Sequence, residues 1–281
     1  MTLRTALIVA LLGLTSFPLR AQAPADTASP AAPLVIGETF TINSRVLHEI
    51  RRINVYAPPV YADSPGVRLP VLYMPDGGVA EDFLHVAGLV QVSVGNGTMR
   101  PFLLVGIENT ERRRDMTGPT DNPKDRRIAP HVSGSAAFRA FVRTELMPLI
   151  RARYRTTAET AVVGESLAGL FVVETFLREP SLFDTYIAFD PSLWWNDHKL
   201  VTEAPDILRA RRGGSKTLFL SNSSEPELAD LTHKFADVLE AGKFQGLDWY
   251  YFPLPDETHG TIYHPAALKA FRTVFKPVAV R

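Results

Sequence analysis

The stretch AVVGESLAGL, residues 161–170, carries the most informative pattern in this sequence. A short apolar run ends at Gly164, Ser166 follows two residues later, and Ala168 and Gly169 open a segment compatible with a helix. The pattern predicts a strand that turns sharply through Ser166 into a helix. At such a turn the serine backbone is strained, so the residues two positions before and after it must be small. Gly164 and Ala168 meet that requirement. A plain turn with Ser166 as a helix N-cap is the simpler interpretation of these ten residues alone.

The surrounding sequence alternates between apolar runs and amphipathic segments. The other runs cover residues 69–75, 101–107, 185–191, 216–222 and 247–253. Unbroken apolar runs are typical of parallel strands that helices cover on both faces. We therefore expect one mostly parallel, doubly wound α/β sheet. Before it, the alternating stretches at residues 37–44 and 46–58 predict an antiparallel N-terminal hairpin at the sheet edge.

The composition excludes several classes of function. The chain has 281 residues, of which 46% are hydrophobic and 21% charged, as in ordinary globular proteins. Basic and acidic residues number 30 each, and basic runs are lacking, so we expect no nucleic-acid partner. The sequence contains no cysteine, which excludes thiol catalysis, zinc–thiolate sites and iron–sulfur clusters.

The N-terminal residues predict a targeting signal. Arg4 precedes an apolar segment at residues 6–14 that is too short to span a bilayer, and small residues follow it. We expect residues 1–25 to be a signal peptide, residues 26–33 a linker, and residues 34–281 the single folded domain. The mature protein would be exported, periplasmic or secreted, without stable membrane insertion. An uncleaved anchor is the alternative.

A serine at a strand-to-helix turn suggests nucleophilic catalysis, for which a histidine base and an acid are needed. In the α/β-hydrolase fold these follow the serine in the order acid, then histidine. His259 lies in a loop just past the last apolar run, and we predict that it is the general base. Glu225, after the run at 216–222, is the preferred acid. Glu227 and Asp190 are the alternatives. The non-catalytic interpretation of each of the three is a solvated loop carboxylate.

Two backbone amides are candidates for stabilising an oxyanion. Leu167 directly follows the serine, and Gly78 lies in the Asp-Gly-Gly segment after the run at 69–75, where Gly77 is the alternative donor. No metal site is expected: His259 and His264 have the wrong spacing for a helical zinc pair, and no H-E-x-x-H pattern occurs.

Several segments together resemble the putative esterases of the esterase D type, a family that includes enterobactin-type trilactone esterases and feruloyl-type esterases. The resemblance runs from about Phe40 to Phe275. It rests on VLYMPDGG, VGIENTERRRDMTGPT, AAFRAFVRTELMPLIRARYRT, VGESLAGL, FDPSLWWN and ETHGTIYHPAAL, in that order.

The resemblance implies an α/β-hydrolase fold and assigns a role to each matching position. Ser166 is the nucleophile, His259 the base, Glu225 the acid, and Gly78 and Leu167 the oxyanion donors. Some members of the family instead have a Ser–His dyad without the acid. It also implies substrate-binding roles, with Arg112 as a cation near anionic groups and Trp194 and Trp195 as pocket walls. Two non-functional interpretations are equally consistent with the sequence: Arg112 belongs to a solvated run of charges, and Trp194 and Trp195 are buried core aromatics.

The expected function is that of a serine esterase, which hydrolyses a small-molecule ester through an acyl-enzyme and needs no cofactor. The alternatives are an acyltransferase or thioesterase on the same site, and a non-catalytic exported binding protein. Siderophore trilactones, feruloylated polysaccharides and small acetyl esters all remain open as substrates, because fold and catalytic residues do not set specificity. The sequence does not fix the oligomeric state.

Overall fold

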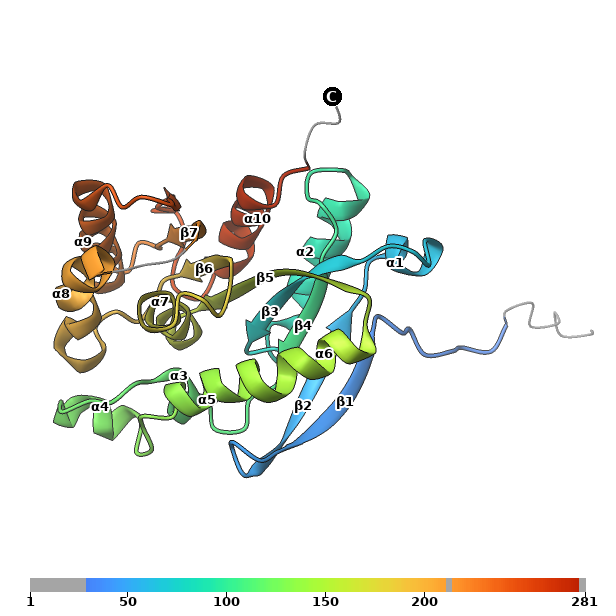
Figure 1. Ribbon diagram of the computed structural model, residues 1–281, viewed down its shortest axis with the longest axis horizontal. Helices are drawn as coiled ribbons and strands as arrows, with labels where there is room; N and C mark the ends of the chain where they lie inside the picture. The colour runs from blue at the N-terminus through green and yellow to red at the C-terminus, as the bar shows by residue number, and fades with distance from the viewer. Residues whose placement is uncertain (1–28, 211–213, 278–281) are drawn as a thin grey trace, which may run out of the picture. The chain divides into compact units, whose positions relative to one another are not determined.

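The computed structural model describes residues 29–210 and 214–277 (Figure 1). The predicted signal peptide and the first three linker residues lie outside these residues. Residues 29–35 contain no helix or strand, and one compact unit spans Ile36–Arg281. Within the described residues, no helix is both long and apolar enough to cross a membrane.

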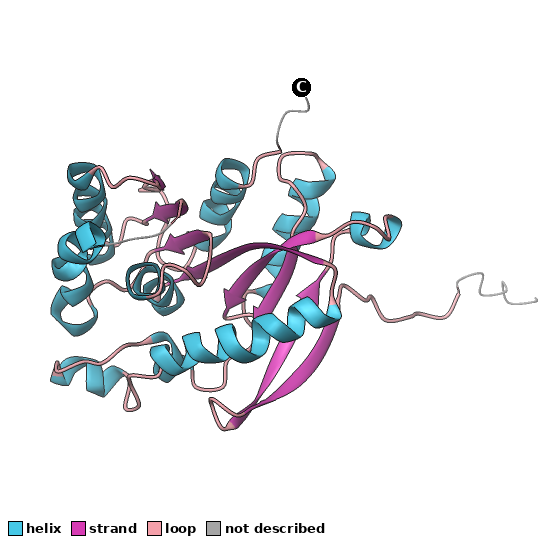
Figure 2. Cartoon of the chain, viewed as in Figure 1, coloured by secondary structure: helices cyan, strands magenta, loops and turns pink. Residues whose placement is uncertain are grey.

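The described part of the chain forms a sheet of eight strands in the order β1-β2-β4-β3-β5-β6-β7-β8 (Figure 2). β2 pairs antiparallel with both β1 and β4, and every other neighbouring pair is parallel. The predicted α/β-hydrolase fold with its N-terminal hairpin is confirmed. The strands are β1 (Glu38–Ser44), β2 (Glu49–Tyr56), β3 (Leu69–Pro75), β4 (Leu103–Ile107), β5 (Thr156–Glu165), β6 (Thr185–Phe189), β7 (Lys216–Ser221) and β8 (Leu247–Tyr251).

Helices cover both faces of the sheet. They are α1 (Pro59–Asp63), α2 (Phe83–Gly95), α3 (Arg112–Met116), α4 (Pro123–Ile128), α5 (Ser135–Phe141), the π-helical segment η1 (Val142–Leu146), α6 (Met147–Arg153), α7 (Leu167–Arg178), α8 (Trp195–Ala210), α9 (Pro226–Gly242) and α10 (Tyr263–Val274). α2 and α10 pack on one face, and α5 to α9 supply the apolar side chains on the other.

The pleat of the central strands explains why their sequences are apolar throughout. Val71 and Tyr73 of β3 join the core under α5 to α9, whereas Leu72 and Met74 join the core under α2 and α10. Successive side chains of a strand point to opposite faces, so a strand covered on both faces must be apolar at every position.

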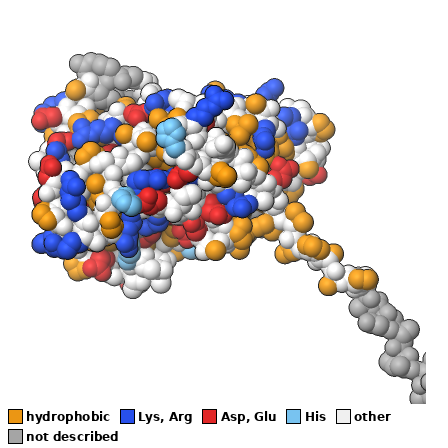
Figure 3. Space-filling model, turned by 90° about the horizontal axis from the view of Figure 1, so that it is seen from below, with side chains coloured by type: hydrophobic (Ala, Val, Ile, Leu, Met, Phe, Trp, Pro, Cys, Tyr) orange, Lys and Arg blue, Asp and Glu red, His pale blue; other side chains and the backbone are white. Residues whose placement is uncertain are grey.

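The surface carries charges of both signs close together. On the face turned to the viewer in Figure 3, Lys and Arg side chains alternate with Asp and Glu. Equal numbers of basic and acidic residues agree with this mixture. The expectation that nucleic acid is not a partner stays a prediction.

The packing of α7 on the sheet generates a stability prediction. A Cβ at Gly169 would lie 2.9 Å from the Phe189 carbonyl oxygen and 3.0 Å from the Pro191 Cα, whereas a Cβ at Gly88 in α2 meets nothing within 4 Å. Gly169→Ala should lower the free energy of unfolding by about 1–3 kcal/mol, because backbone must move. Gly88→Ala should raise it by about 0.5–1 kcal/mol, since alanine favours a helix.

Urea unfolding of the two variants and the wild type checks this prediction. A Gly169→Ala protein as stable as Gly88→Ala would show that α7 does not pack as tightly on β6 as described.

Candidate active site

The turn between β5 and α7 has the backbone strain that the sequence predicts. Ser166 has φ 61° and ψ −121°, a conformation that residues with a side chain rarely adopt. A Cβ at Gly164 would lie 2.7 Å from the backbone carbonyl of Ala168, so glycine is required there. Ala168 is fully buried, and its own methyl group is accommodated.

Three side chains form a continuous hydrogen-bonded chain at this turn. His259 Nε2 lies 3.1 Å from Ser166 Oγ, and His259 Nδ1 lies 3.0 Å from Asp190 Oδ2. Ser166 lies between β5 and α7, Asp190 directly follows β6, and His259 lies in the loop between β8 and α10. The imidazole can therefore accept the serine proton on one nitrogen while the carboxylate fixes the tautomer at the other.

The structure does not support Glu225 as the acid. Glu225 is exposed at the N-cap of α9, and among the described contacts its side chain makes no hydrogen bond to His259. Glu227 is also exposed and lies 4.0 Å from His198. The position at Nδ1 belongs to Asp190, the alternative acid. β6 adjoins β5, so the first residue after β6 is brought beside the serine turn, whereas the segment after β7 directs its carboxylates to solvent.

Asp190 is fully buried and held by the neighbouring backbone. Its Oδ1 accepts the N–H of Ser223 at 2.6 Å, and its own N–H donates to the Ser221 carbonyl at 2.9 Å. A buried carboxylate requires such hydrogen-bond partners, because removing it from water without them costs roughly several kcal/mol. Asp190 also has φ 40°, so the backbone is bent where the carboxylate turns toward His259.

The segment after β7 anchors the histidine loop. Ser224 donates from its N–H and from its Oγ to the Glu257 carbonyl, at 2.9 and 2.8 Å. Leu254 N–H donates to the Asn222 carbonyl at 2.8 Å. The part of the chain in which the sequence places the acid thus positions the base.

The surroundings of His259 favour its protonated form. The hydrogen bond to Asp190 raises the pKa of His259 above its ordinary 6.5, against the opposing effect of burial, and the charges of Glu165, Asp190 and Glu225 raise it further. An imidazolium formed during proton transfer would therefore be stabilised.

Glu165 is a site residue that the sequence reasoning does not find. Its Oε1 lies 3.2 Å from His259 Nδ1, and its side chain is 15% exposed. Burial raises the pKa of Glu165 to about 7. The only signal in the sequence is a carboxylate between the apolar run that ends at Gly164 and Ser166.

Glu165, Asp190 and His259 also bring three metal-ligand atoms within 4.8 Å of one another. The hydrogen bonds of His259 to Ser166 and Asp190 account for this cluster without an ion. The absence of a catalytic metal stays a prediction.

The two predicted oxyanion donors differ in their present partners. The Gly78 N–H donates to Glu81 Oε2 at 2.7 Å, so this amide already binds an anionic oxygen. The Gly77 N–H, the alternative, is committed to the Ile107 carbonyl at 3.0 Å. Leu167 is the first residue of α7, and amides of a first helical turn have no partner within the helix. Gly78 and Leu167 remain the predicted donors.

Arg112 forms an ion pair within the protein, and its side chain is 34% exposed. Its Nε and Nη2 donate to the two carboxylate oxygens of Asp76 at 2.6 and 2.8 Å. Asp76 is buried at the end of β3 with φ 57°, and Asn109 Nδ2 donates to it at 2.6 Å. This bidentate pair holds the Asp-Gly-Gly segment. The substrate-binding role of Arg112 stays a prediction.

The two tryptophans closely follow Ser192, whose N–H donates to the Ser166 carbonyl at 3.0 Å. Trp195 is 4% exposed, and its Nε1 donates to the Gly118 carbonyl at 3.1 Å. Trp194 is partly buried against the core, with its ring centroid 5.9 Å from that of Trp195. Both rings pack on the core, and Trp195 also lines a cavity, while their role as walls of the substrate pocket stays a prediction.

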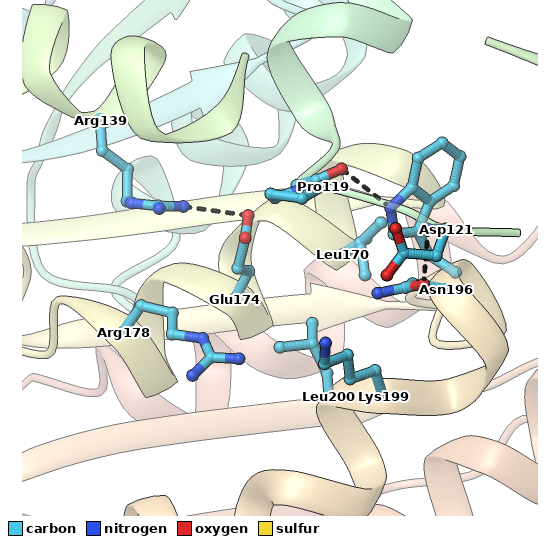
Figure 4. Close-up of a pocket in the computed structure, with 11 residues that line it drawn as sticks. Pro119, Asp121, Arg139, Leu170, Glu174, Arg178, Asn196, Lys199 and Leu200 are labelled. Atoms are coloured by element: carbon cyan, nitrogen blue, oxygen red, sulfur yellow. Dashed lines mark hydrogen bonds and ion pairs between the residues drawn. The ribbon is translucent and has the colours of Figure 1, made fainter. Parts of the chain in front are cut away.

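A cavity of about 340 Å³ lies beside α7 (Figure 4). Figure 4 shows Arg139 directed at the Glu174 carboxylate, to which it donates at 3.0 Å. The cavity begins one helical turn beyond the serine, at Leu170, whose N–H donates to the Ser166 carbonyl. Ser166, His259, Arg112 and Trp194 do not line it. Its lining residues are Gly118, Pro119, Asp121, Arg139, Leu170, Glu174, Arg178, Trp195, Asn196, Lys199 and Leu200.

Curated relatives of this chain include esterases of iron-binding siderophores. The chain is 30% identical over 169 residues to the ferri-bacillibactin esterase BesA of Bacillus subtilis, a match that covers 53% of this chain and 56% of BesA. It is 25% identical over 171 residues to the iron(III) salmochelin esterase of Escherichia coli O6:H1, covering 58% of this chain and 37% of that protein. The chain thus spans about half the length, or less, of these relatives.

Solved structures agree over most of the chain. The IroE-like serine hydrolase of Shewanella oneidensis is 30% identical, with a TM-score of 0.79 over 87% of this chain and 82% of that one. The BES protein of Bacillus cereus has a TM-score of 0.77 at 20% identity over 89% of this chain and all of its own, and shows the shared fold. The family described as "Putative esterase" matches residues 44–240, and the predicted resemblance is confirmed: this chain belongs to that family.

Proposed function

We propose that this protein is an exported serine hydrolase that cleaves carboxylic esters of the siderophore type. The observation that carries the proposal is the hydrogen-bonded chain from Ser166 through His259 to the buried Asp190, at a strained strand-to-helix turn. Relatives named as siderophore esterases support the substrate class. The apolar N-terminal segment supports export.

The proposed reaction has two steps. Ser166 Oγ attacks the ester carbonyl carbon while His259 Nε2 takes its proton, and the imidazolium then protonates the leaving alkoxide as the ester C–O bond breaks. Water, deprotonated by His259, attacks the acyl-enzyme carbonyl carbon; the bond to Ser166 Oγ then breaks, the imidazolium returns its proton to Oγ, and the carboxylic acid is released. The amides of Leu167 and Gly78 would bind the oxyanion after substrate displaces the Glu81 carboxylate.

The same geometry argues against the alternative of a non-catalytic binding protein, because nucleophile, base and acid all stand within hydrogen-bond distance. A thioesterase or acyltransferase would use the same groups. The choice between these and an esterase depends on which molecule accepts the acyl group. Product analysis with competing alcohols identifies the acceptor.

Removing the nucleophile should abolish turnover and preserve the fold. Ser166→Ala should lower kcat for a siderophore trilactone and for a simple aryl ester by roughly 10⁴–10⁶-fold, because the acyl-enzyme cannot form. Initial rates on both esters, with urea unfolding of each protein, test this.

A fluorophosphonate probe is the control, and it should label the wild type but not the variant. Wild-type rates in Ser166→Ala, or a wild-type protein that the probe does not label, would refute the proposed mechanism.

A pair of acid substitutions tests the identity of the acid. Asp190→Asn should lower kcat by at least about tenfold, and by up to roughly 10⁴-fold, because the amide cannot hold the required imidazole tautomer. Glu225→Gln should change kcat by less than about threefold, since the exposed carboxylate acts on His259 only through space. A larger loss in Glu225→Gln than in Asp190→Asn would restore Glu225 as the acid.

The pH dependence of kcat/KM follows from the raised pKa of His259. The base acts only when neutral, so activity should be lost as the pH falls through the pKa of His259, with a midpoint above 6.5. Asp190→Asn should move this midpoint to lower pH, because the hydrogen bond that raises the pKa is removed. Rate profiles from pH 5 to 9 measure both midpoints, and a wild-type midpoint below 6.5 would contradict the assignment of the base.

A further inference from the structure

Two carboxylates face the same nitrogen of the proposed base. Asp190 Oδ2 lies 3.0 Å and Glu165 Oε1 3.2 Å from His259 Nδ1. The sheet dictates this arrangement, because Glu165 ends β5 in register with Phe189, the last residue of β6. Asp190 is the next residue, so the two acids emerge side by side.

The two contacts with His259 are not equivalent. The imidazole N–H is hydrogen-bonded to Asp190. Within the described residues, Glu165 Oε1 is a buried oxygen without a hydrogen-bond partner, although it lies 3.2 Å from Nδ1. A buried carboxylate oxygen normally has a partner, so one left without is a candidate for a functional role.

We propose that Glu165 is a second positioning residue for His259, one that adds negative charge beside the imidazolium and accepts the Nδ1–H when Asp190 cannot. This inference rests on the proposed function, in which His259 is the general base. Glu165 does not contact the reacting atoms and acts only through the imidazole.

Charged groups from several elements set the ionisation of Glu165. Burial raises its pKa most, the positive charges of His259 and Arg112 lower it, and the negative charges of Asp190 and Asp82 raise it. The negative charge of Glu165 in turn raises the pKa of Tyr263, a buried residue of α10, although burial raises that pKa most. With its pKa raised to about 7, Glu165 is partly protonated at neutral pH, which relieves the repulsion from Asp190.

This electrostatic coupling means that the two acids are not independent. In Asp190→Asn the like charge is gone, so the pKa of Glu165 should fall and its ionised carboxylate should become available to Nδ1. Glu165 should therefore matter more in the Asp190→Asn background than in the wild type. Non-additivity of this kind is what a double-mutant cycle measures.

The cycle compares the wild type, Glu165→Gln, Asp190→Asn and the double variant on an aryl ester. Glu165→Gln alone should lower kcat by about two- to tenfold with KM unchanged, because only transition-state charge is affected. In the Asp190→Asn background the same change should cost at least about 30-fold, since no carboxylate is then left to orient the ring. An equal kcat for Asp190→Asn and the double variant would overturn the inference.

A measurement independent of turnover separates this inference from the proposed function. NMR titration should show that Glu165→Gln lowers the pKa of His259 by about one pH unit, because a nearby negative charge is removed. Glu227→Gln, an exposed carboxylate, is the matched control and should leave it unchanged. Glu165→Asp keeps the charge but shortens the side chain, and should lower the pKa of His259 by less than Glu165→Gln does. It replaces the glutamine variant in the test if that variant unfolds.

An unchanged pKa of His259 in both Glu165 variants would refute the role of Glu165, whatever the enzyme hydrolyses. Loss of the proposed function would instead appear as a wild type that neither reacts with the fluorophosphonate probe nor turns over esters.

Discussion

The strained turn at Ser166 is the constraint on which the rest of the site depends. With φ at 61°, the chain leaves β5 and enters α7 within one residue, which lifts the hydroxyl out of the sheet edge. The turn is tied to the next strand by two hydrogen bonds: the Ser166 N–H donates to the Phe189 carbonyl, and the Ser192 N–H donates to the Ser166 carbonyl. Asp190 lies between Phe189 and Ser192 in the chain, so fixing the serine also fixes the acid.

The charges around this turn are balanced in pairs that keep buried ions compensated. Asp76 is neutralised by Arg112 at the end of β3, and Asp190 faces His259 at the end of β6. Glu165 shares His259 with Asp190, and its burial is the main cause of its raised pKa. The pair between Arg112 and Asp76 also gives the Asp-Gly-Gly segment a fixed position beside the serine turn.

The sequence was sufficient to predict the features that depend on local patterns. Apolar runs predicted the sheet, small residues around Ser166 predicted the turn, and position after the last strand singled out His259. The acid could not be chosen in this way, because Asp190 and Glu225 both follow apolar runs and only the pairing of β5 with β6 brings one of them to the imidazole. The ion pair of Arg112 was equally hidden, since Asp76 lies 36 residues away in the chain.

The hydrogen bonds at His259 have a consequence for how the protein folds. The base is 93 residues from the serine and 69 from Asp190, and it belongs to the last loop before the final helix. Contacts between residues so far apart in the sequence form late in folding. The conformational entropy of closing the intervening chain is lost before the energy of the contact is gained. β6, β7 and β8 separate the serine from its proton acceptor in the chain, so their contact requires closure of that whole segment. Before that closure, the Ser166 hydroxyl lacks the group that takes its proton.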